Sequence, residues 1–300
     1  MMGLADYLKH CTLCPRNCKA DRTIKPGFCG CDDKIKVALA SLHFWEEPCI
    51  SGTNGSGTVF FSGCQLKCCF CQNYKISAQN FGKEISEERL SELFLELQEK
   101  NAHNINLVSP TPYIPFIIKA LDKVKGKLKI PVVFNSGGYE KVQTLKMLEG
   151  YIDVYLPDLK YMDSEMSKKY SCAEDYFEVA LVAIKEMFRQ TGKISFDDNG
   201  IIQKGTIIRH LVLPNGRKDS INIVNWIADN FKSGDIYLSL MSQYTPYNFS
   251  KDFPELNRRI STFEYNSVVE EAMNRNLKGF MQEKSSAKEE YTPDFNLAGL

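Results

Sequence analysis

The densest group of reactive side chains in the sequence is a run of four cysteines within eight residues: Cys64, Cys68, Cys69 and Cys71. Cys64, Cys68 and Cys71 have the spacing C-x3-C-x2-C. A structural zinc site takes four ligands, commonly from two C-x2-C pairs, and no second pair follows this loop. Three thiolates in one tight loop suit three corners of a cubane iron–sulfur cluster, whose fourth iron then remains open to a substrate or cofactor. The alternatives are a zinc knuckle, a crowded structural loop, or an electron-transfer cluster completed by Cys69.

The loop resembles the C-x3-C-x-aromatic-C motif of the radical S-adenosylmethionine (SAM) superfamily, with Phe70 at the aromatic position. The continuation Cys71-Gln72-Asn73 is typical of the branch that contains the pyruvate formate-lyase activating enzymes. Further stretches resemble one group in that branch, and they run from residue 11 to residue 247: CTLCPRNC, FWEEPCISGTNGSGTVFFSGC, NINLVSPT, YLPDLKY, IRHLVLPN and MSQYTP.

The resemblance implies a [4Fe-4S] cluster on Cys64, Cys68 and Cys71, with SAM chelating the open iron. The reduced cluster would cleave SAM to methionine and a 5'-deoxyadenosyl radical, which takes a hydrogen atom from the substrate. The expected substrate is a glycyl residue of a partner glycyl-radical enzyme, or alternatively another peptide or a small molecule. The expected electron donor is a flavodoxin or ferredoxin. Activating enzymes often carry further clusters after the main loop, but no cysteine occurs between Cys71 and Cys172, which weakens a direct assignment to pyruvate formate-lyase.

Candidate SAM-binding residues follow the early strands of the predicted sheet. In the superfamily, the position of Phe70 lies beside the adenine. The branch commonly has Gly-Gly-Glu after the second strand, where this chain has Ser109-Pro110-Thr111, so Ser109 and Thr111 are the expected acceptors for the amino group of SAM. After the third strand, Asn135 and Ser136 precede two glycines that permit close backbone approach, and they are candidates for the ribose or methionine moiety.

Charged residues follow or occupy the later strands. Asp158 and Lys160 form an Asp-x-Lys that faces the site in related enzymes, and a surface ion pair is the alternative. Arg209 lies inside a buried strand pattern, where an unpaired charge is costly. The carboxylate of SAM is a suitable bidentate partner for this guanidinium, and a structural salt bridge is the alternative.

A second group of cysteines lies near the N-terminus: Cys11, Cys14, Cys18, Cys29 and Cys31. A segment this small gains little from core burial, so a metal is expected to stabilise it. Zinc would take two ligands from the first three of these cysteines, together with Cys29 and Cys31, whereas a second cubane cluster would use any four of the five. Free structural thiols are the alternative.

These residues need a scaffold, and the pattern of the chain supplies one. From residue 57, six short β-rich runs, among them Asn104–Ser109, alternate with helical patterns, which predicts βαβ units and a parallel sheet. The expected fold is α/β, a partial (β/α)6-type radical SAM barrel, with the cysteine loop on the active-site face after the first strand. We expect a cysteine-rich module at 1–50, the barrel core at 51–281 and a tail at 282–300, with Cys49–Gly57 as linker and a loop or small hairpin at 191–205.

Composition limits the class of protein. The 37 Lys and Arg residues balance 37 Asp and Glu residues, which argues against general nucleic-acid binding. No signal-peptide pattern and no membrane-length apolar run is found, so a cytoplasmic protein without a membrane partner is expected. The crowded, odd-numbered cysteines then favour metal ligation over disulfides.

Overall fold

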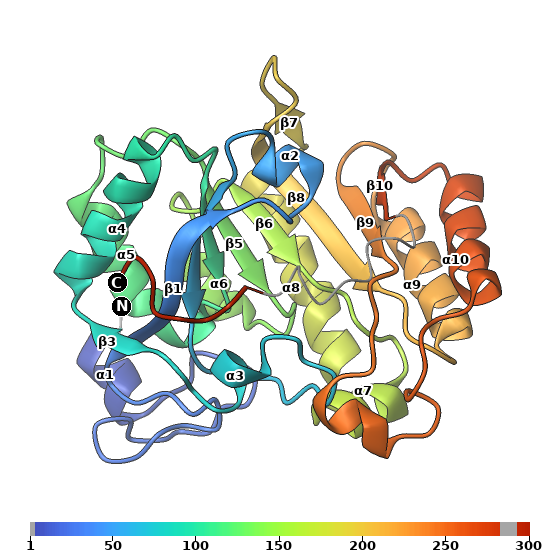
Figure 1. Ribbon diagram of the computed structural model, residues 1–300, viewed down its shortest axis with the longest axis horizontal. Coiled ribbons are helices and arrows are strands. Elements are labelled where there is room, and N and C mark those ends of the chain that lie inside the picture. Colours follow the sequence, from blue (N-terminus) through green and yellow to red (C-terminus); the bar gives the residue numbers. More distant parts are fainter. Residues whose placement is uncertain (1–3, 283–292) are drawn as a thin grey trace.

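The computed structural model describes residues 4–282 and 293–300, and its centre is a curved sheet (Figure 1). The strand order is β10-β9-β8-β6-β5-β4-β2-β1-β3. All neighbouring pairs from β2 to β9 are parallel. The six central strands are β2 (Ser56–Phe61), β4 (Ile105–Val108), β5 (Val132–Ser136), β6 (Val154–Pro157), β8 (Ile202–Leu211) and β9 (Tyr237–Met241). The predicted partial (β/α)6 barrel is therefore confirmed.

Helices connect the parallel strands, as the alternating pattern predicts. They are α3 (Tyr74–Ser77), α4 (Glu87–Glu99), α5 (Ile114–Lys123), α6 (Val142–Met147), α7 (Ser164–Ser171), α8 (Tyr176–Thr191), α9 (Arg217–Asn230) and α10 (Thr262–Asn274). Two further helices come earlier in the chain: α1 (Leu4–Lys9) and α2 (Pro48–Ser51). Helix α4 shows why they form: the Ser86 side chain caps its first turn, and Leu90, Leu93 and Leu97 recur on the face that packs on the sheet. Short 3-10 turns lie at Thr111–Tyr113 and Asn248–Asp252.

Four further strands extend the sheet. β1 (Ile35–His43) pairs antiparallel with β2 and with β3 (Lys83–Ile85), and β10 (Gly279–Met281) pairs parallel with β9. β7 (Ser195–Phe196) pairs with β8, which confirms the hairpin expected within 191–205. β1 and β2 lie on either side of residue 50, where the sequence predicts a domain boundary, and they pair within one sheet. The division into module and core stays a prediction.

Two segments lie elsewhere than the sequence suggests. The expected linker Cys49–Gly57 is wrong for its first residues, because Cys49 and Ile50 belong to α2 and pack inside the barrel against Val133 and Val154. Of the expected tail, residues 283–292 lie outside the described residues. In the remainder, the Leu297 amide donates to the carbonyl of Ala38 in β1 (3.1 Å).

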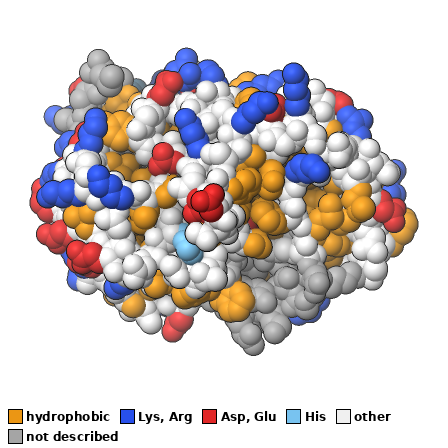
Figure 2. All heavy atoms as spheres, turned by 90° about the horizontal axis from the view of Figure 1, so that it is seen from above, with side chains coloured by type: hydrophobic (Ala, Val, Ile, Leu, Met, Phe, Trp, Pro, Cys, Tyr) orange, Lys and Arg blue, Asp and Glu red, His pale blue; other side chains and the backbone are white. Residues whose placement is uncertain are grey.

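Helices α4 and α5 lie at one side of the sheet and α9 and α10 at the other, with α2 near the amino ends of the central strands (Figure 1). The face seen in Figure 2 mixes basic, acidic and hydrophobic side chains. Across the described ranges, no helix combines the length and the apolar character that a membrane crossing requires.

Candidate active site

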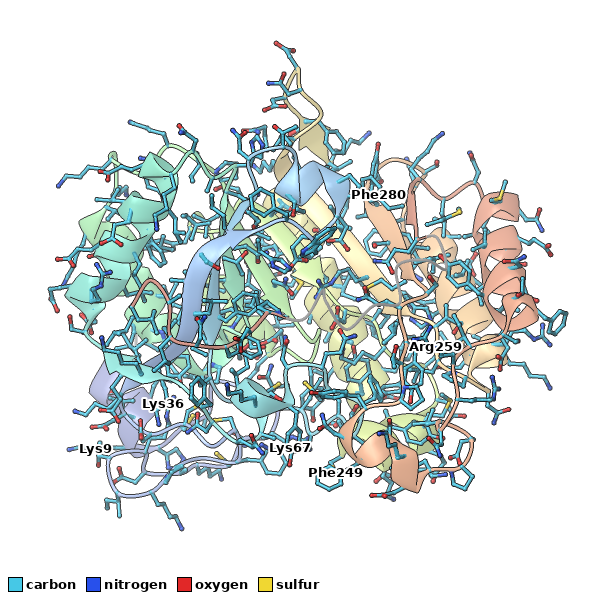
Figure 3. All side chains as sticks on the ribbon, viewed as in Figure 1. Lys9, Lys36, Lys67, Phe249, Arg259 and Phe280 are labelled. Atoms are coloured by element: carbon cyan, nitrogen blue, oxygen red, sulfur yellow. The ribbon has the colours of Figure 1, made fainter. Side chains whose placement is uncertain are left out.

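The cysteine loop leaves the carboxyl end of β2 and is tied to two distant segments. The Cys64 amide donates to the carbonyl of Cys29 (3.2 Å), and the Cys69 amide donates to the carbonyl of Tyr170 (2.8 Å). Lys67 of this loop lies at the end of the molecule where α3 and α7 lie, opposite α2 (Figure 3). The loop therefore occupies the face on which (β/α) barrels carry their active sites, as predicted.

The three motif cysteines are close enough to affect one another, and two have hydroxyl partners. The Ser171 hydroxyl donates to Sγ of Cys68 (3.0 Å), and Oγ of Ser77 lies 3.2 Å from Sγ of Cys71. Burial, with the nearby Cys68 thiol as a smaller cause, raises the pKa of Cys64 to about 12 and that of Cys71 to about 11. These thiols would stay protonated unless a cation stabilised their thiolate forms.

Cys69 and Phe70 face a different environment. Both are buried in an apolar cluster with Leu66 and Tyr244, and the rings of Phe70 and Tyr244 meet edge to face with centroids 5.9 Å apart. Thiols near Cys69 include Cys68 and Cys172. The packing of Phe70 accounts for its burial, and its contact with adenine stays a prediction.

Arg209 of β8 is the centre of a polar network inside the barrel. Its Nε lies 2.9 Å from Oδ1 of Asp158, its Nη1 3.1 Å from Oε2 of Glu46, and its Nη2 donates to Oδ1 of Asn135 (2.7 Å). Lys160 pairs with the other oxygen of Asp158 (2.5 Å). The structure thus brings Asn135, Asp158, Lys160 and Arg209 together. The structure pairs Arg209 with protein carboxylates, the salt-bridge alternative, and its contact with SAM stays a prediction.

Charge pairing sets the protonation of this network. Burial opposes the ionisation of Asp158, but Arg209 and Lys160 outweigh it and hold the pKa of Asp158 below its usual range. Burial also opposes the charged form of Lys160, but Asp158 and the Cys68 thiol raise its pKa. Lys160 is therefore a cation positioned between a carboxylate and one motif cysteine.

Sequence reasoning missed two carboxyl groups of this site, Glu46 and Glu47. They lie between β1 and α2, and burial raises the pKa of both, while Arg209 opposes the shift. Oε2 of Glu47 is buried and has no hydrogen-bond partner among the described residues. The signal available in the sequence was a pair of acids between Trp45 and the buried Cys49.

Glu140 is a third missed carboxyl group, and it contacts the cysteine loop through Gln65. The Gln65 amide donates to its Oε1 (2.8 Å), and the Thr111 hydroxyl donates to its Oε2 (2.9 Å). Ser136 also hydrogen-bonds to Glu140. Thr111 and Ser136 are therefore engaged within the protein.

Ser109 has a φ of 56° and donates its backbone amide hydrogen to the carbonyl of Asn135 (2.9 Å). The roles of Ser109, Thr111 and Ser136 toward SAM stay predictions.

The turns after β5 and β6 are joined by Tyr176 of α8. Its hydroxyl lies 2.8 Å from the Asp158 carbonyl and 2.9 Å from the Gly137 carbonyl, and it accepts the Lys160 amide (3.0 Å). Gly138 has a φ of 76°, and a Cβ there would lie 2.0 Å from the Asp158 carbonyl oxygen. Close backbone approach at Gly138 thus fixes where Asp158 and Lys160 project.

Comparison with known proteins agrees with this geometry. The profile of the Radical SAM superfamily matches residues 58–198. An uncharacterised protein of Methanocaldococcus jannaschii is 32% identical over 284 residues, which cover 91% of this chain and 77% of the relative. The chain belongs to the radical SAM superfamily.

Solved structures also match this chain, at low sequence identity. Streptococcus suis SuiB bound to its precursor peptide SuiA matches with a TM-score of 0.50 at 15% identity, covering 73% of this chain and 46% of SuiB. This chain therefore spans about half the length of SuiB. A domain of pyruvate-formate lyase-activating enzyme from Bacteroides vulgatus matches with a TM-score of 0.42 at 15% identity, covering 57% of this chain and 92% of that domain.

The loop residues fit the cluster that the radical SAM superfamily implies. Cys64, Cys68 and Cys71 are soft thiol donors, which iron–sulfur clusters require. The hydroxyls of Ser171 and Ser77 stand where they can donate to thiolate sulfur. SAM also finds suitable groups, because the unpartnered carboxyl oxygen of Glu47 is complementary to a hydroxyl, ammonium or sulfonium group.

The N-terminal cysteines lie against this loop. Cys11, Cys29 and Cys31 are buried, Cys14 is half-buried and Cys18 is exposed. Whether they hold zinc or a second cluster stays a prediction.

Proposed function

We propose that this chain is a radical SAM enzyme that abstracts a hydrogen atom from a glycyl residue of a partner protein. The proposal rests mainly on one observation. Three thiols lie beside the Asp158–Lys160–Arg209 network at the carboxyl ends of the strands. When bound, the reduced [4Fe-4S] cluster and SAM supply a 5'-deoxyadenosyl radical that is reactive enough to break a C–H bond.

The residues of the chain have separate tasks in this proposal. Cys64, Cys68 and Cys71 hold the cluster. Lys160 stabilises negative charge at Cys68, and Asp158 orients Lys160 through their ion pair.

The SAM site would combine the predicted residues with those that the structure adds. Asn135 and Arg209 line the barrel interior and offer polar atoms to SAM. Glu47 offers a carboxyl oxygen without a protein partner. α2 fills the opposite part of the barrel with apolar side chains, including Ile50, which excludes water from that side.

A peptide substrate is supported by two observations. The loop and its Cys71-Gln72-Asn73 continuation resemble the activating-enzyme branch. SuiB, which shares the fold, is bound to a precursor peptide. Each SAM cleavage consumes one electron, so the proposal also requires a small redox protein such as a flavodoxin or ferredoxin.

A purely electron-transferring cluster is the competing function, and it would need a fourth protein ligand. Cys69 is the candidate for that ligand, because its buried thiol lies near Cys68. A Cys69→Ala variant that loses its cluster would favour this competing function.

The substrate class can be tested with deuterium. Cells of the source organism are grown on α-deuterated glycine, and their extract is separated by gel filtration into protein and small-molecule fractions. Each fraction is incubated anaerobically with the reconstituted enzyme, SAM and dithionite, with Cys68→Ala as control. We expect deuterium in 5'-deoxyadenosine, and a glycyl radical signal in electron paramagnetic resonance, with the protein fraction only. Deuterium transfer from the small-molecule fraction alone would overturn the glycyl proposal and favour a small-molecule substrate.

A further inference from the structure

Arg22 is a buried cation for which the described residues provide no carboxylate. Its side chain is 1% exposed. Nε donates to the carbonyl of Asp32 (2.8 Å) and Nη1 to the carbonyl of Pro112 (2.7 Å), while Nη2 has no partner. A buried charge of this kind is costly unless an opposite charge compensates it. The site therefore calls for an anion.

The groups beside Arg22 that can carry negative charge are the thiols of Cys31, Cys29 and Cys11, with the Tyr113 hydroxyl as a smaller contributor. Neutral thiols would leave the guanidinium uncompensated. Thiolates bound to a metal would compensate it, because a zinc ion or a [4Fe-4S] cluster with four cysteine ligands keeps a net negative charge.

Four N-terminal cysteines lie near one another. A Cβ on Gly27 would lie 3.4 Å from Sγ of Cys18 and 3.6 Å from Sγ of Cys29, so both sulfurs flank this glycine. Cys11 lies within electrostatic range of Cys18 and Cys29, and Cys14 lies within range of Cys11 and Cys29. The chain folds back on itself between Cys11 and Ala20. The Cys11 amide donates to the carbonyl of Ala20, and the Lys19 amide donates to the carbonyl of Cys11.

We propose that Cys11, Cys14, Cys18 and Cys29 bind a second metal centre, a zinc ion or an iron–sulfur cluster, whose negative charge is compensated by Arg22. Cys31 is left out of this ligand set, because its Sγ is directed to the carbonyl of Ser62 (3.5 Å) at the start of the active-site loop and is hydrogen-bonded to the Cys29 thiol.

This centre would support the active-site loop directly. The carbonyl of its ligand Cys29 accepts the amide of Cys64 (3.2 Å), and Nε of Arg16 donates to the carbonyl of Gln65 (2.9 Å). Loss of the metal would therefore loosen the backbone that carries the first active-site cysteine.

The test uses a full-length variant in which Cys64, Cys68 and Cys71 are all replaced by Ala, so that its result is independent of the proposed SAM chemistry. After anaerobic purification and reconstitution, iron, acid-labile sulfide and zinc are measured per chain. We expect either about four irons with about four sulfides or about one zinc to remain. Adding Cys18→Ala to this variant should abolish that content, whereas adding Cys31→Ala should preserve it.

Arg22 provides the second arm. Arg22→Met removes the positive charge and should lower the remaining metal content several-fold. Arg22→Lys keeps the positive charge and should retain most of the metal. Circular dichroism checks that each variant is folded. A folded variant without the loop cysteines that binds neither metal would overturn the proposal, as would loss of metal in Cys31→Ala but not in Cys18→Ala.

Discussion

Glu140 gives the most quantitative prediction, because its carboxyl group is buried among neutral partners. Burial raises its pKa from the ordinary 4.5 to about 8, and the hydrogen bonds from Thr111, Ser136 and Gln65 only partly oppose this. Between these values the folded chain keeps a proton that the unfolded chain has lost. The contribution of Glu140 to the free energy of unfolding is therefore greatest below pH 4.5 and declines as the pH rises towards 8.

The expected size follows from the shift. Each pH unit between the two pKa values costs about 1.4 kcal/mol, so the parent should lose about 2 kcal/mol from pH 6 to pH 8 through this group. Glu140→Gln removes the titration and keeps the shape. Its free energy of unfolding, relative to the parent, should therefore rise by about 2 kcal/mol over the same range.

Anaerobic urea denaturation at pH 6, 7 and 8, followed by circular dichroism, measures this difference. Glu99→Gln, which changes an exposed carboxylate at the end of α4, is the matched control and should show no comparable trend. A difference between Glu140→Gln and the parent that stays constant with pH would refute the reasoning, because Glu140 would then be ionised in the folded chain.

Two further substitutions test how the site is held. Gly138→Ala would place a methyl group 2.0 Å from the Asp158 carbonyl oxygen and should destabilise the chain by more than about 3 kcal/mol. The control Gly126→Ala has a similar φ of 82° but open space around it, and it should cost only about 1 kcal/mol. Equal costs of the two substitutions in urea denaturation would contradict this account. Tyr176→Phe leaves the buried Lys160 amide without its acceptor and should cost about 1–3 kcal/mol in the same assay, and an unchanged free energy of unfolding would mean that the hydroxyl does not join the two turns.

The sequence predicted the strands well because buried parallel strands are continuous apolar runs. The expected strand Asn104–Ser109, for example, corresponds to β4. Helix α7 was not predicted, because its sequence SEMSKKYS lacks an apolar stripe. It forms because Asp163 caps it and Tyr170 packs into the core. Local pattern therefore fails where one cap and one aromatic residue suffice.

The missed carboxyl groups show a different limit. Glu46 lies 163 residues from Arg209 in sequence, and only the fold brings the two together. The unpartnered Nη2 of Arg22 also could not be predicted from the sequence, since the burial of this side chain depends on distant segments such as the one containing Pro112. Local sequence pattern can propose ligands such as Cys64, Cys68 and Cys71, but the charges that surround them are set by tertiary contacts.

The central claim is that the three-cysteine loop supports SAM cleavage. The direct measurement is the yield of 5'-deoxyadenosine and methionine from reconstituted, dithionite-reduced protein with SAM. It compares the parent, Cys68→Ala and Cys69→Ala. Our account predicts both products from the parent and from Cys69→Ala, and neither from Cys68→Ala. Loss of the cluster in Cys69→Ala, or an intact reduced cluster that yields no product even when extract of the source cells is added, would contradict it.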